Sequence, residues 1–419
     1  MTRGRAWALA AVVAAAPRLI ALAVERGDIL ESFTEKSDDF ARAFVASGTF
    51  GMIPDVPSAY TQPLYGFFLV PIYWIFGRHW LAVGLAQIAL ACVTAILVYE
   101  IGRRLRLSPA FALLAAATTT VSPYLVWHDV HVNREIVDQP LAAGVVLATL
   151  VAAERRSWRV AGLAGALCGL AILGNSRLVF LPLVLGAWLL WRVSGSEPQT
   201  PRWLAPAAVL LVSALVVLPW VVRNKDEVGC FALTTDGRAL WKANNPQTYD
   251  LLTHGKWIDD VRRIPHSEYN PEEALALYRQ RGIVYRPHEC DQMRFYTRLA
   301  RTWVRNHPGE KAKLAQLAAR MEWDPRPTKT EGRPSRGGAV DTARDTVQPL
   351  YTGALFALGI AGLWFAPRPF VVLALALLAH NTLAAMAFVG ATRYRVSWDF
   401  LTALLAACAV QALWKRRRT

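Results

Sequence analysis

Two carboxylates stand side by side soon after the first apolar stretch of the sequence. The run 35–40 reads EKSDDF, with Asp38 next to Asp39. A carboxylate within hydrogen-bond reach of a hydroxyl group can take its proton and act as a general base. Asp38 and Asp39 are therefore candidate catalytic residues, and Asp38 is favoured. A solvated acidic loop is the alternative interpretation of the same pattern.

A second group of ionisable residues lies at 128–135 (HDVHVNRE), between two apolar runs. Ionisable side chains held at a membrane are candidates for function by default. We predict that Glu135 is catalytic and that the others contact substrate: His128, Asp129, His131 and Arg134. The two histidines and Asp129 are also possible ligands of a divalent metal, but their spacing matches no metal motif. Neither a metal nor another cofactor is predicted.

Three further segments place arginine at the edge of an apolar run. Arg177 lies in the turn 174–177 (GNSR), and Arg223 and Asn224 close the run 203–222. The triplet Arg393, Tyr394 and Arg395 precedes the last run. Guanidinium groups pair well with phosphate, so the four arginines are predicted to bind substrate. Their neighbours Asn224 and Tyr394 are predicted to bind substrate with them. Anchoring to anionic lipid headgroups is the alternative.

The composition indicates that the chain carrying these candidate residues is a membrane protein. Of 419 residues, 54% are hydrophobic and only 18% are charged, which is too apolar for an ordinary soluble domain. A membrane span needs about 20 mostly apolar residues. About ten runs are candidates, namely 6–24, 80–102, 108–127, 136–153, 160–174, 178–192, 203–222, 349–366, 369–389 and 397–414. The first could resemble a secretory signal, but we interpret it as a retained helix.

Basic clusters set the expected orientation. Arg3 and Arg5, 103–106, 155–159, 192–202, Arg368 and 415–418 all fall on one side when ten spans are threaded in order. Because positively charged loops stay in the cytoplasm, both termini are predicted to be cytoplasmic. The net charge of +15 therefore favours membrane orientation over nucleic-acid binding. Every candidate site segment then lies outside.

Two outer segments have features of their own. Residues 65–76 (YGFFLVPIYWIF) are apolar but too short to span, which predicts a juxtamembrane helix. The long hydrophilic segment 223–348 has helical spacing at 271–281 and 293–305, and a flexible linker is expected at 326–338. Its two cysteines, Cys230 and Cys290, form either one disulfide or two free thiols.

The order of these motifs resembles the GT-C superfamily of polytopic glycosyltransferases. In particular, it is similar to the bacterial branch related to protein O-mannosyltransferases and lipid A aminoarabinose transferases. The motifs that carry the resemblance are 37–40 (SDDF), 46–51 (ASGTFG), 61–65 (TQPLY), 122–124 (SPY), 174–177, 218–224 (LPWVVRN), 234–237 (TTDG), 240–246 (LWKANNP) and 393–395 (RYR). Two features depart from the family pattern: Arg134 replaces the usual Thr before Glu135, and the Asp38-Asp39 doublet leaves the catalytic position ambiguous.

The resemblance implies an all-α membrane protein with about ten transmembrane helices of GT-C type, juxtamembrane helices in the first outer loop and a small, mainly helical outer domain. The expected division is 1–222, with outer loops 25–79 and 128–135, then 223–348 and 349–419. It also implies a polyprenyl-phosphate sugar donor and an acceptor hydroxyl on a lipid, glycan or protein. The predicted location is the plasma membrane of a bacterium, and the reaction is expected to invert the anomeric configuration.

Other functions fit some of the same residues. A transporter or flippase of a lipid-linked saccharide could use the same arginines, but the sequence lacks the internal repeat typical of transporters. A ligase or polymerase that uses pyrophosphate-linked glycans is a second alternative. A non-catalytic scaffold is a third.

Overall fold

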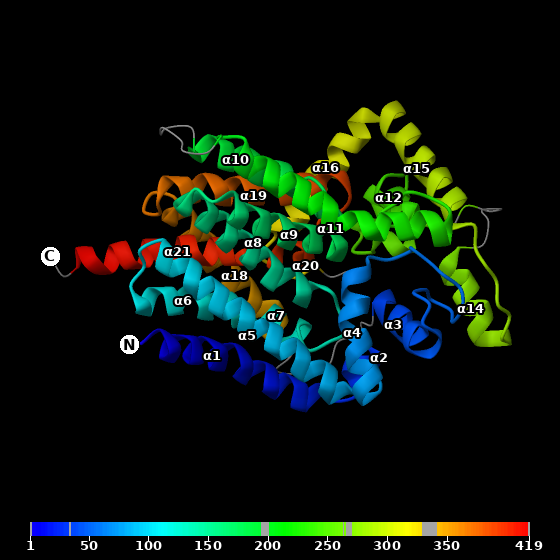
Figure 1. The fold of residues 1–419 in the computed structure, drawn as a ribbon, viewed down its shortest axis with the longest axis horizontal. Helices are drawn as coiled ribbons and strands as arrows, with labels where there is room; N and C mark the ends of the chain where they lie inside the picture. Colours follow the sequence, from blue (N-terminus) through cyan, green and yellow to red (C-terminus); the bar gives the residue numbers. More distant parts are fainter. Residues whose placement is uncertain are drawn as a thin grey trace.

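A computed structural model describes residues 2–32, 35–193, 201–262, 264, 270–328 and 342–417, without the side chains of Val193 and Ala343. The described chain is helical throughout, with one isolated β-bridge between Ile53 and Val56. Figure 1 shows a bundle of long helices with shorter helices gathered at one end. The predicted all-α fold is thus confirmed for the described residues. Most of the predicted linker 326–338, part of the loop 192–202 and the end of the 415–418 cluster lie outside them.

A helix corresponds to each predicted membrane span. These are α1 (Arg3–Glu25), α5 (Trp80–Arg104), α6 (Pro109–Thr120), α8 (Glu135–Arg155), α9 (Trp158–Gly174), α10 (Leu181–Val193), α11 (Leu204–Val228), α18 (Gln348–Gly362), α19 (Arg368–Ala387) and α21 (Asp399–Arg416). Among the described helices, α1, α5, α8, α11 and α19 are long and apolar enough to cross a membrane unaided. The chain is therefore a multi-pass membrane protein, and the number ten stays a prediction.

One predicted span is divided. The run 108–127 forms α6 and then α7 (Pro123–His128), with Val121 and Ser122 between them. Pro123 has no backbone N–H, and its ring disfavours a helical conformation at Ser122. The prediction of one continuous helix was wrong here because the proline begins a new helix. The break turns α7 toward the second outer loop.

Small residues let the helices of the bundle approach closely. The Ser213 hydroxyl of α11 donates to the carbonyl oxygen of Gly165 in α9 at 3.0 Å. A side chain at Gly165 or Gly169 would collide with the backbone of α11, and one at Gly362 would collide with α21. Close backbone approach through small residues is the usual means of packing helices in lipid. These contacts fix the framework on which the outer loops stand.

The first outer loop forms three helices, α2 (Asp28–Glu31), α3 (Lys36–Ser47) and α4 (Pro63–Phe76). Gly48 ends α3 in a left-handed conformation with φ 74°, which glycine adopts without strain. Helix α4 contains the predicted juxtamembrane segment, and Figure 1 shows it running across the direction of α1 and α5. Trp74, Ile75 and Phe76 at its end are exposed, as suits a helix at the lipid interface.

The segment after α11 holds the remaining outer helices. They are α12 (Gly237–Ala243), α13 (Thr248–Thr253), η2 (Ile258–Asp260), α14 (Pro271–Arg281), α15 (Glu289–Asn306) and α16 (Pro308–Trp323). The chain returns to the bundle through η3 (Ala343–Val347) and α18. Cys230 and Cys290 form a disulfide with Cα atoms 5.9 Å apart, which joins the end of α11 to α15. The domain boundaries themselves stay a prediction.

Figure 1 shows the start of α1 and the end of α21 at one end of the bundle, with α3, α12, α14 and α15 at the other. Both termini thus lie opposite the outer helices. Which end faces the cytoplasm stays a prediction from the charge distribution.

A buried ion pair joins α1 to the second outer loop. Arg18 donates to one Asp129 carboxylate oxygen from Nε at 3.0 Å and from Nη2 at 2.6 Å, and both side chains are fully buried. Arg18 also donates to the carbonyl oxygen of Thr120 at the end of α6. Gln139 of α8 donates to the other Asp129 oxygen at 2.7 Å. This pair therefore joins the second outer loop to α1, α6 and α8.

We expect Arg18→Met to destabilise the protein by about 3–5 kcal/mol, because it leaves the Asp129 charge buried without its partner. Thermal unfolding in detergent would measure the loss. Arg3→Gln is the matched control on the same helix, since Arg3 pairs with Glu100 at the exposed surface. Equal losses in the two variants would contradict the importance of the buried pair.

Candidate functional site

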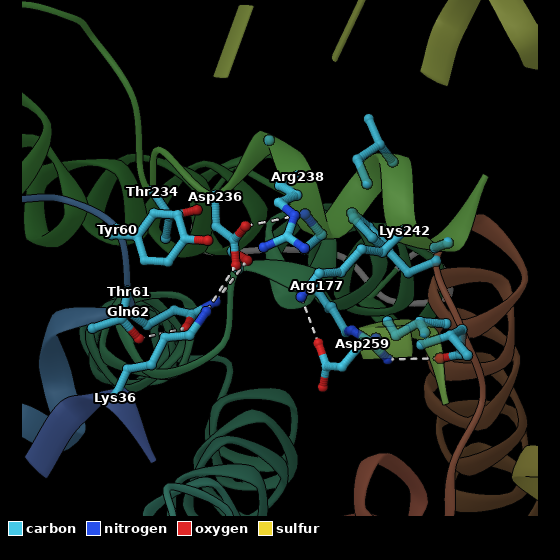
Figure 2. A pocket seen from close by; sticks show the side chains of 18 of the residues that line it. Lys36, Tyr60, Thr61, Gln62, Arg177, Thr234, Asp236, Arg238, Lys242 and Asp259 are labelled. Carbon is cyan, nitrogen blue, oxygen red and sulfur yellow. Dashed lines mark hydrogen bonds and ion pairs between the residues drawn. The ribbon is translucent and has the colours of Figure 1, made fainter. Parts of the chain in front are cut away.

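A cavity of about 750 Å³ lies between the outer loops and the outer helices. The first loop contributes Glu35, Lys36 and 60–62, and the second loop contributes Arg134. The turn η1 (Ser176–Leu178) and the short helix α20 (Thr392–Val396) contribute Arg177, Arg393 and Tyr394. The outer segment covers it with residues of α12, η2, α14 and α15. Figure 2 shows Lys36, Tyr60, Thr61 and Gln62 on one wall and Arg177, Lys242 and Asp259 opposite.

Three arginines meet in the half of the cavity nearest the bundle. Arg134 donates to the Gln62 Oε1 atom at 2.8 Å, and Arg177 donates to the Val389 carbonyl oxygen at 3.0 Å. The Arg177 guanidinium lies over the Tyr394 ring at 3.5 Å, and Arg393 donates to the Tyr394 hydroxyl at 2.6 Å. Burial, followed by the charges of Arg134 and Arg393, lowers the pKa of Arg177 to about 10. Desolvated cations of this kind attract an anion.

Two carboxylates face these arginines. Glu35 lines the cavity just before α3, and its Oε1 atom lies 3.9 Å from Arg393 Nη1. Burial and then the charge of Glu135 raise the pKa of Glu35. Glu135 is itself buried, 4.0 Å from Arg134 Nε and from His128 Nε2, and neither of its oxygens accepts a hydrogen bond from the described residues. The pair is therefore an acidic centre beside a cationic one.

Asp38 and Asp39 do not line the cavity. The Asp38 carboxylate accepts from the Tyr73 hydroxyl at 2.5 Å and from Arg78 Nε at 3.0 Å, so it binds α3 to the end of α4. Asp39 pairs with Arg279 of α14 and lies 3.8 Å from Arg42. Lys36 and Glu35, at the start of α3, occupy the cavity wall instead.

Some of the predicted residues in the second outer loop hold the fold together, and others lie at or near the cavity. Asp129 is held by Arg18, and His131 lies with Nε2 at 3.5 Å from Glu25 and Nδ1 at 2.9 Å from the Trp127 carbonyl oxygen. His128 points toward Glu135. Only Arg134 of this loop lines the cavity. Within the described ranges, no group of three or more His, Cys, Asp or Glu residues is arranged to hold a metal ion.

Three other predicted residues bind backbone. Arg223 donates to the carbonyl oxygens of Ser58 at 2.9 Å and Phe50 at 2.8 Å, which fixes the first loop to the end of α11. Asn224 is fully buried and donates to the Ala232 carbonyl oxygen at 2.8 Å. Arg395 is fully buried, donating to the Glu322 carbonyl oxygen at 2.7 Å and pairing with Asp399 at 3.1 Å. These side chains hold the walls without lining the cavity.

An apolar groove of about 840 Å³ runs between α10 and α19. Phe180, Leu183, Trp188 and Trp191 line one side, and Val372, Ala379, Leu383 and Phe388 line the other. Ser176, Arg177 and Phe388 line both this groove and the polar cavity. The groove therefore ends at the half-buried guanidinium of Arg177.

Sequence reasoning missed several residues of the cavity. They are Glu35, Lys36, Tyr60, Gln62, Asn175, Asp236, Arg238, Lys242, Trp257, Asp259 and Glu272. Glu35 and Lys36 lie two to three positions before the Asp38-Asp39 doublet, and Asp236 and Lys242 fall in the stretches 234–237 and 240–246 that carry the family resemblance. Gln62 and Asn175 likewise fall in the quoted stretches 61–65 and 174–177, whereas Arg238, Trp257, Asp259 and Glu272 belong to no motif and reach the cavity only through folding.

Part of the chain matches the sequence model of one enzyme family. Residues 55–222 match the sequence model of the dolichyl-phosphate-mannose-protein mannosyltransferase family. No curated protein sequence matches the chain. The matched region begins just before α4 and ends at Val222, near the end of α11.

Solved structures share the fold at low sequence identity. The apo oligosaccharyltransferase of Archaeoglobus fulgidus has a TM-score of 0.55 and 13% identity, over 99% of this chain and 51% of that chain. The archaeal oligosaccharyltransferase AglB from Archaeoglobus fulgidus, in complex with an inhibitory peptide and a dolichol-phosphate, has a TM-score of 0.54 and 12% identity, over 99% of this chain and 50% of that chain. The chain thus spans about half the length of the archaeal enzyme. ArnT from Cupriavidus metallidurans bound to undecaprenyl phosphate has a TM-score of 0.41 and 17% identity, over 96% of this chain and 77% of that chain.

The three arginines predict an anion site that can be tested without a reaction. We expect Arg393→Gln to weaken binding of dodecyl phosphate about 10- to 100-fold, because a charge-assisted hydrogen bond contributes roughly 1.5–3 kcal/mol. Calorimetry on the detergent-solubilised protein would measure it. Arg223→Gln is the control, since Arg223 binds backbone outside the cavity. A similar loss in both variants would argue against a localised phosphate site.

Proposed function

We propose that this protein is a GT-C glycosyltransferase that transfers a sugar from a polyprenyl-phosphate donor to an acceptor hydroxyl at the outer face of a bacterial plasma membrane, with inversion at the anomeric carbon. The observation that carries the proposal is the meeting of the apolar groove with the polar cavity at Arg177. A polyprenyl phosphate has the same division, with a long hydrocarbon chain and an anionic head. The related archaeal enzyme AglB, which shares the fold, has been solved with a dolichol-phosphate.

The donor fits the site in one orientation. Its chain lies in the groove between α10 and α19, and its phosphate lies beside Arg177, Arg134 and Arg393. The sugar then projects into the cavity. Burying apolar surface stabilises the chain by about 25 cal/mol per Å², and the arginines supply specificity for the phosphate.

The chemistry needs a base and a stabilised leaving group. The acceptor oxygen attacks the anomeric carbon, a new C–O bond forms, and the bond from that carbon to the phosphate oxygen breaks. The acceptor proton passes to a carboxylate, and the polyprenyl phosphate leaves with the bonding electrons. Fixed guanidinium groups stabilise the negative charge that develops on the leaving oxygen. Direct attack of this kind inverts the configuration.

We assign the base to Glu35 in preference to Asp38 or Asp39. Glu35 lines the cavity, whereas Tyr73 and Arg78 bind the Asp38 carboxylate and Arg279 binds Asp39. A raised pKa makes a carboxylate a stronger base at neutral pH. Glu135 supports this role, since its charge is part of the cause of the raised pKa.

The direct experiment supplies purified enzyme in liposomes with a radiolabelled undecaprenyl-phosphate sugar and with its pyrophosphate counterpart. Transfer of label from the monophosphate donor to an acceptor supports the proposal. Label that crosses the bilayer without transfer would indicate a flippase, and transfer only from the pyrophosphate would indicate a ligase or polymerase.

The groove predicts dependence on the length of the donor chain. Ala379→Trp places a large side chain in the groove, so we expect the KM for an undecaprenyl donor to rise at least tenfold while a farnesyl donor is affected less. Leu375→Trp is the matched control, because Leu375 is exposed on the same helix outside the groove. Steady-state kinetics with the two donors would decide. Equal effects of the two variants would contradict the assignment of the groove.

The base assignment predicts a pH dependence. Glu35 must be ionised to accept a proton, so the transfer rate falls as the pH drops through its pKa, which lies above the usual value of about 4.3. Glu35→Gln should lower kcat by about 100-fold or more. Asp39→Asn should keep both the rate and the pH profile. A full loss in Asp39→Asn with an active Glu35→Gln would return the base to the aspartate doublet.

A further inference from the structure

The half of the cavity beneath the outer helices has a different charge pattern from the arginine half. Lys36 Nζ lies 2.9 Å from Glu272 and 3.6 Å from Asp236, and Arg238 Nη1 lies 3.1 Å from Glu272. Lys242 Nζ pairs with Asp259 at 2.5 Å. Three cations and three carboxylates thus neutralise one another, and Figure 2 shows Lys36, Asp236, Arg238, Lys242 and Asp259 around one space.

These paired groups keep hydrogen-bonding capacity to spare. Burial alone would raise the pKa of Glu272, but the charge of Lys36 and then those of Lys242 and Arg238 outweigh it and lower the pKa to about 2. Glu272 is therefore an ionised acceptor at every physiological pH. A carboxylate offers about four acceptor positions and a guanidinium five N–H donors, so these ion pairs leave several positions unused.

Tyr60 supplies a second, independent sign of a ligand. Its side chain is 1% exposed, it lines the cavity, and its hydroxyl has no hydrogen-bond partner among the described residues. Burial and then the charge of Asp236 raise the pKa of Tyr60, so the hydroxyl stays protonated. A buried hydroxyl without a partner is costly, and a ligand group in the cavity would satisfy it.

We infer that this half of the cavity binds a neutral oligosaccharide, whose terminal hydroxyl is the acceptor. The inference rests on the proposed function and names its acceptor class. Neighbouring sugar hydroxyls donate to Asp236 and Glu272 and accept from Arg238 and the Tyr60 hydroxyl, while the half-buried Trp257 ring offers an apolar face. Because Glu35 directly precedes Lys36, an oxygen held at the Lys36 wall lies on the way to the proposed base.

Other acceptors fit this surface less well. An anionic glycan would gain no net attraction from charges that already balance. A peptide that binds by strand addition needs a free strand edge, and the bridge between Ile53 and Val56, the one extended pairing in the described residues, is outside the cavity. A lipid acceptor needs its own apolar groove. The aromatic pocket at Phe44, Phe50, Phe67 and Trp220 does not serve as that groove, because it shares no lining residue with the cavity.

The test measures binding to the full-length protein in lipid nanodiscs by saturation-transfer NMR. The probes are gluco-, manno-, galacto- and arabino-configured neutral trisaccharides, trigalacturonic acid and a Ser/Thr-containing octapeptide. We expect at least one neutral trisaccharide to bind. Tyr60→Phe should weaken it about fivefold, the loss of one neutral hydrogen bond. Glu272→Gln should weaken it tenfold or more.

Tyr60→Phe separates binding from folding, because the removed hydroxyl has no partner in the described protein and thermal unfolding should not change. Dodecyl phosphate should bind both variants like the parent, whereas Arg393→Gln should lose the phosphate and keep the trisaccharide. Binding of no trisaccharide, an unchanged affinity in Tyr60→Phe, or Tyr60-dependent binding of the peptide or trigalacturonate would each overturn the inference. Failure of the donor proposal would show instead as absent lipid-phosphate binding with saccharide binding intact.

Discussion

The position of one cation, Arg177, decides how the two halves of this protein meet. A guanidinium at the edge of the bilayer must be neutralised or stabilised by polar partners, because its charge is poorly solvated there. Arg177 is stabilised by the Tyr394 ring and the Val389 carbonyl oxygen. The turn between α9 and α10 is thereby bound to the segment that follows α19. The same contact places the guanidinium where the apolar groove reaches the polar cavity.

The charged residues outside the bundle divide into supports and site. Asp129, Arg223, Asn224 and Arg395 are bound by fixed partners, and each ties an outer loop to a helix. Their bonds hold the start of α8, the first loop and α20 in place. Residues with fewer fixed partners, such as Glu35 and Glu135, lie at the cavity or beside it. A preorganised site needs both kinds, since rigid supports limit the reorganisation that catalysis requires.

The outer helices complete the site and also hold its floor. Lys311 of α16 donates to the carbonyl oxygens of Met386 at 2.7 Å and Ala387 at 3.1 Å, which lie at the end of α19 where the helix itself offers no donor. Asn381 of α19 in turn donates to Glu322 of α16. The disulfide of Cys230 with Cys290 joins the same outer segment to α11. The lid over the proposed acceptor region is thus connected to the helices that line the donor groove.

The sequence by itself determined the helical membrane character, the positions of most helices of the bundle and the arginines Arg134, Arg177 and Arg393 that line the cavity. Hydropathy and charge are local properties, so they can be read along the chain. The tertiary structure alone decided that Glu35 faces the cavity while Asp38 and Asp39 face away, because Glu35 has an extended backbone just before α3 whereas the two aspartates lie within the helix. It alone joined Lys36 to Asp236 and Glu272, more than 190 residues away. Such pairings depend on how distant helices pack, which no local pattern encodes.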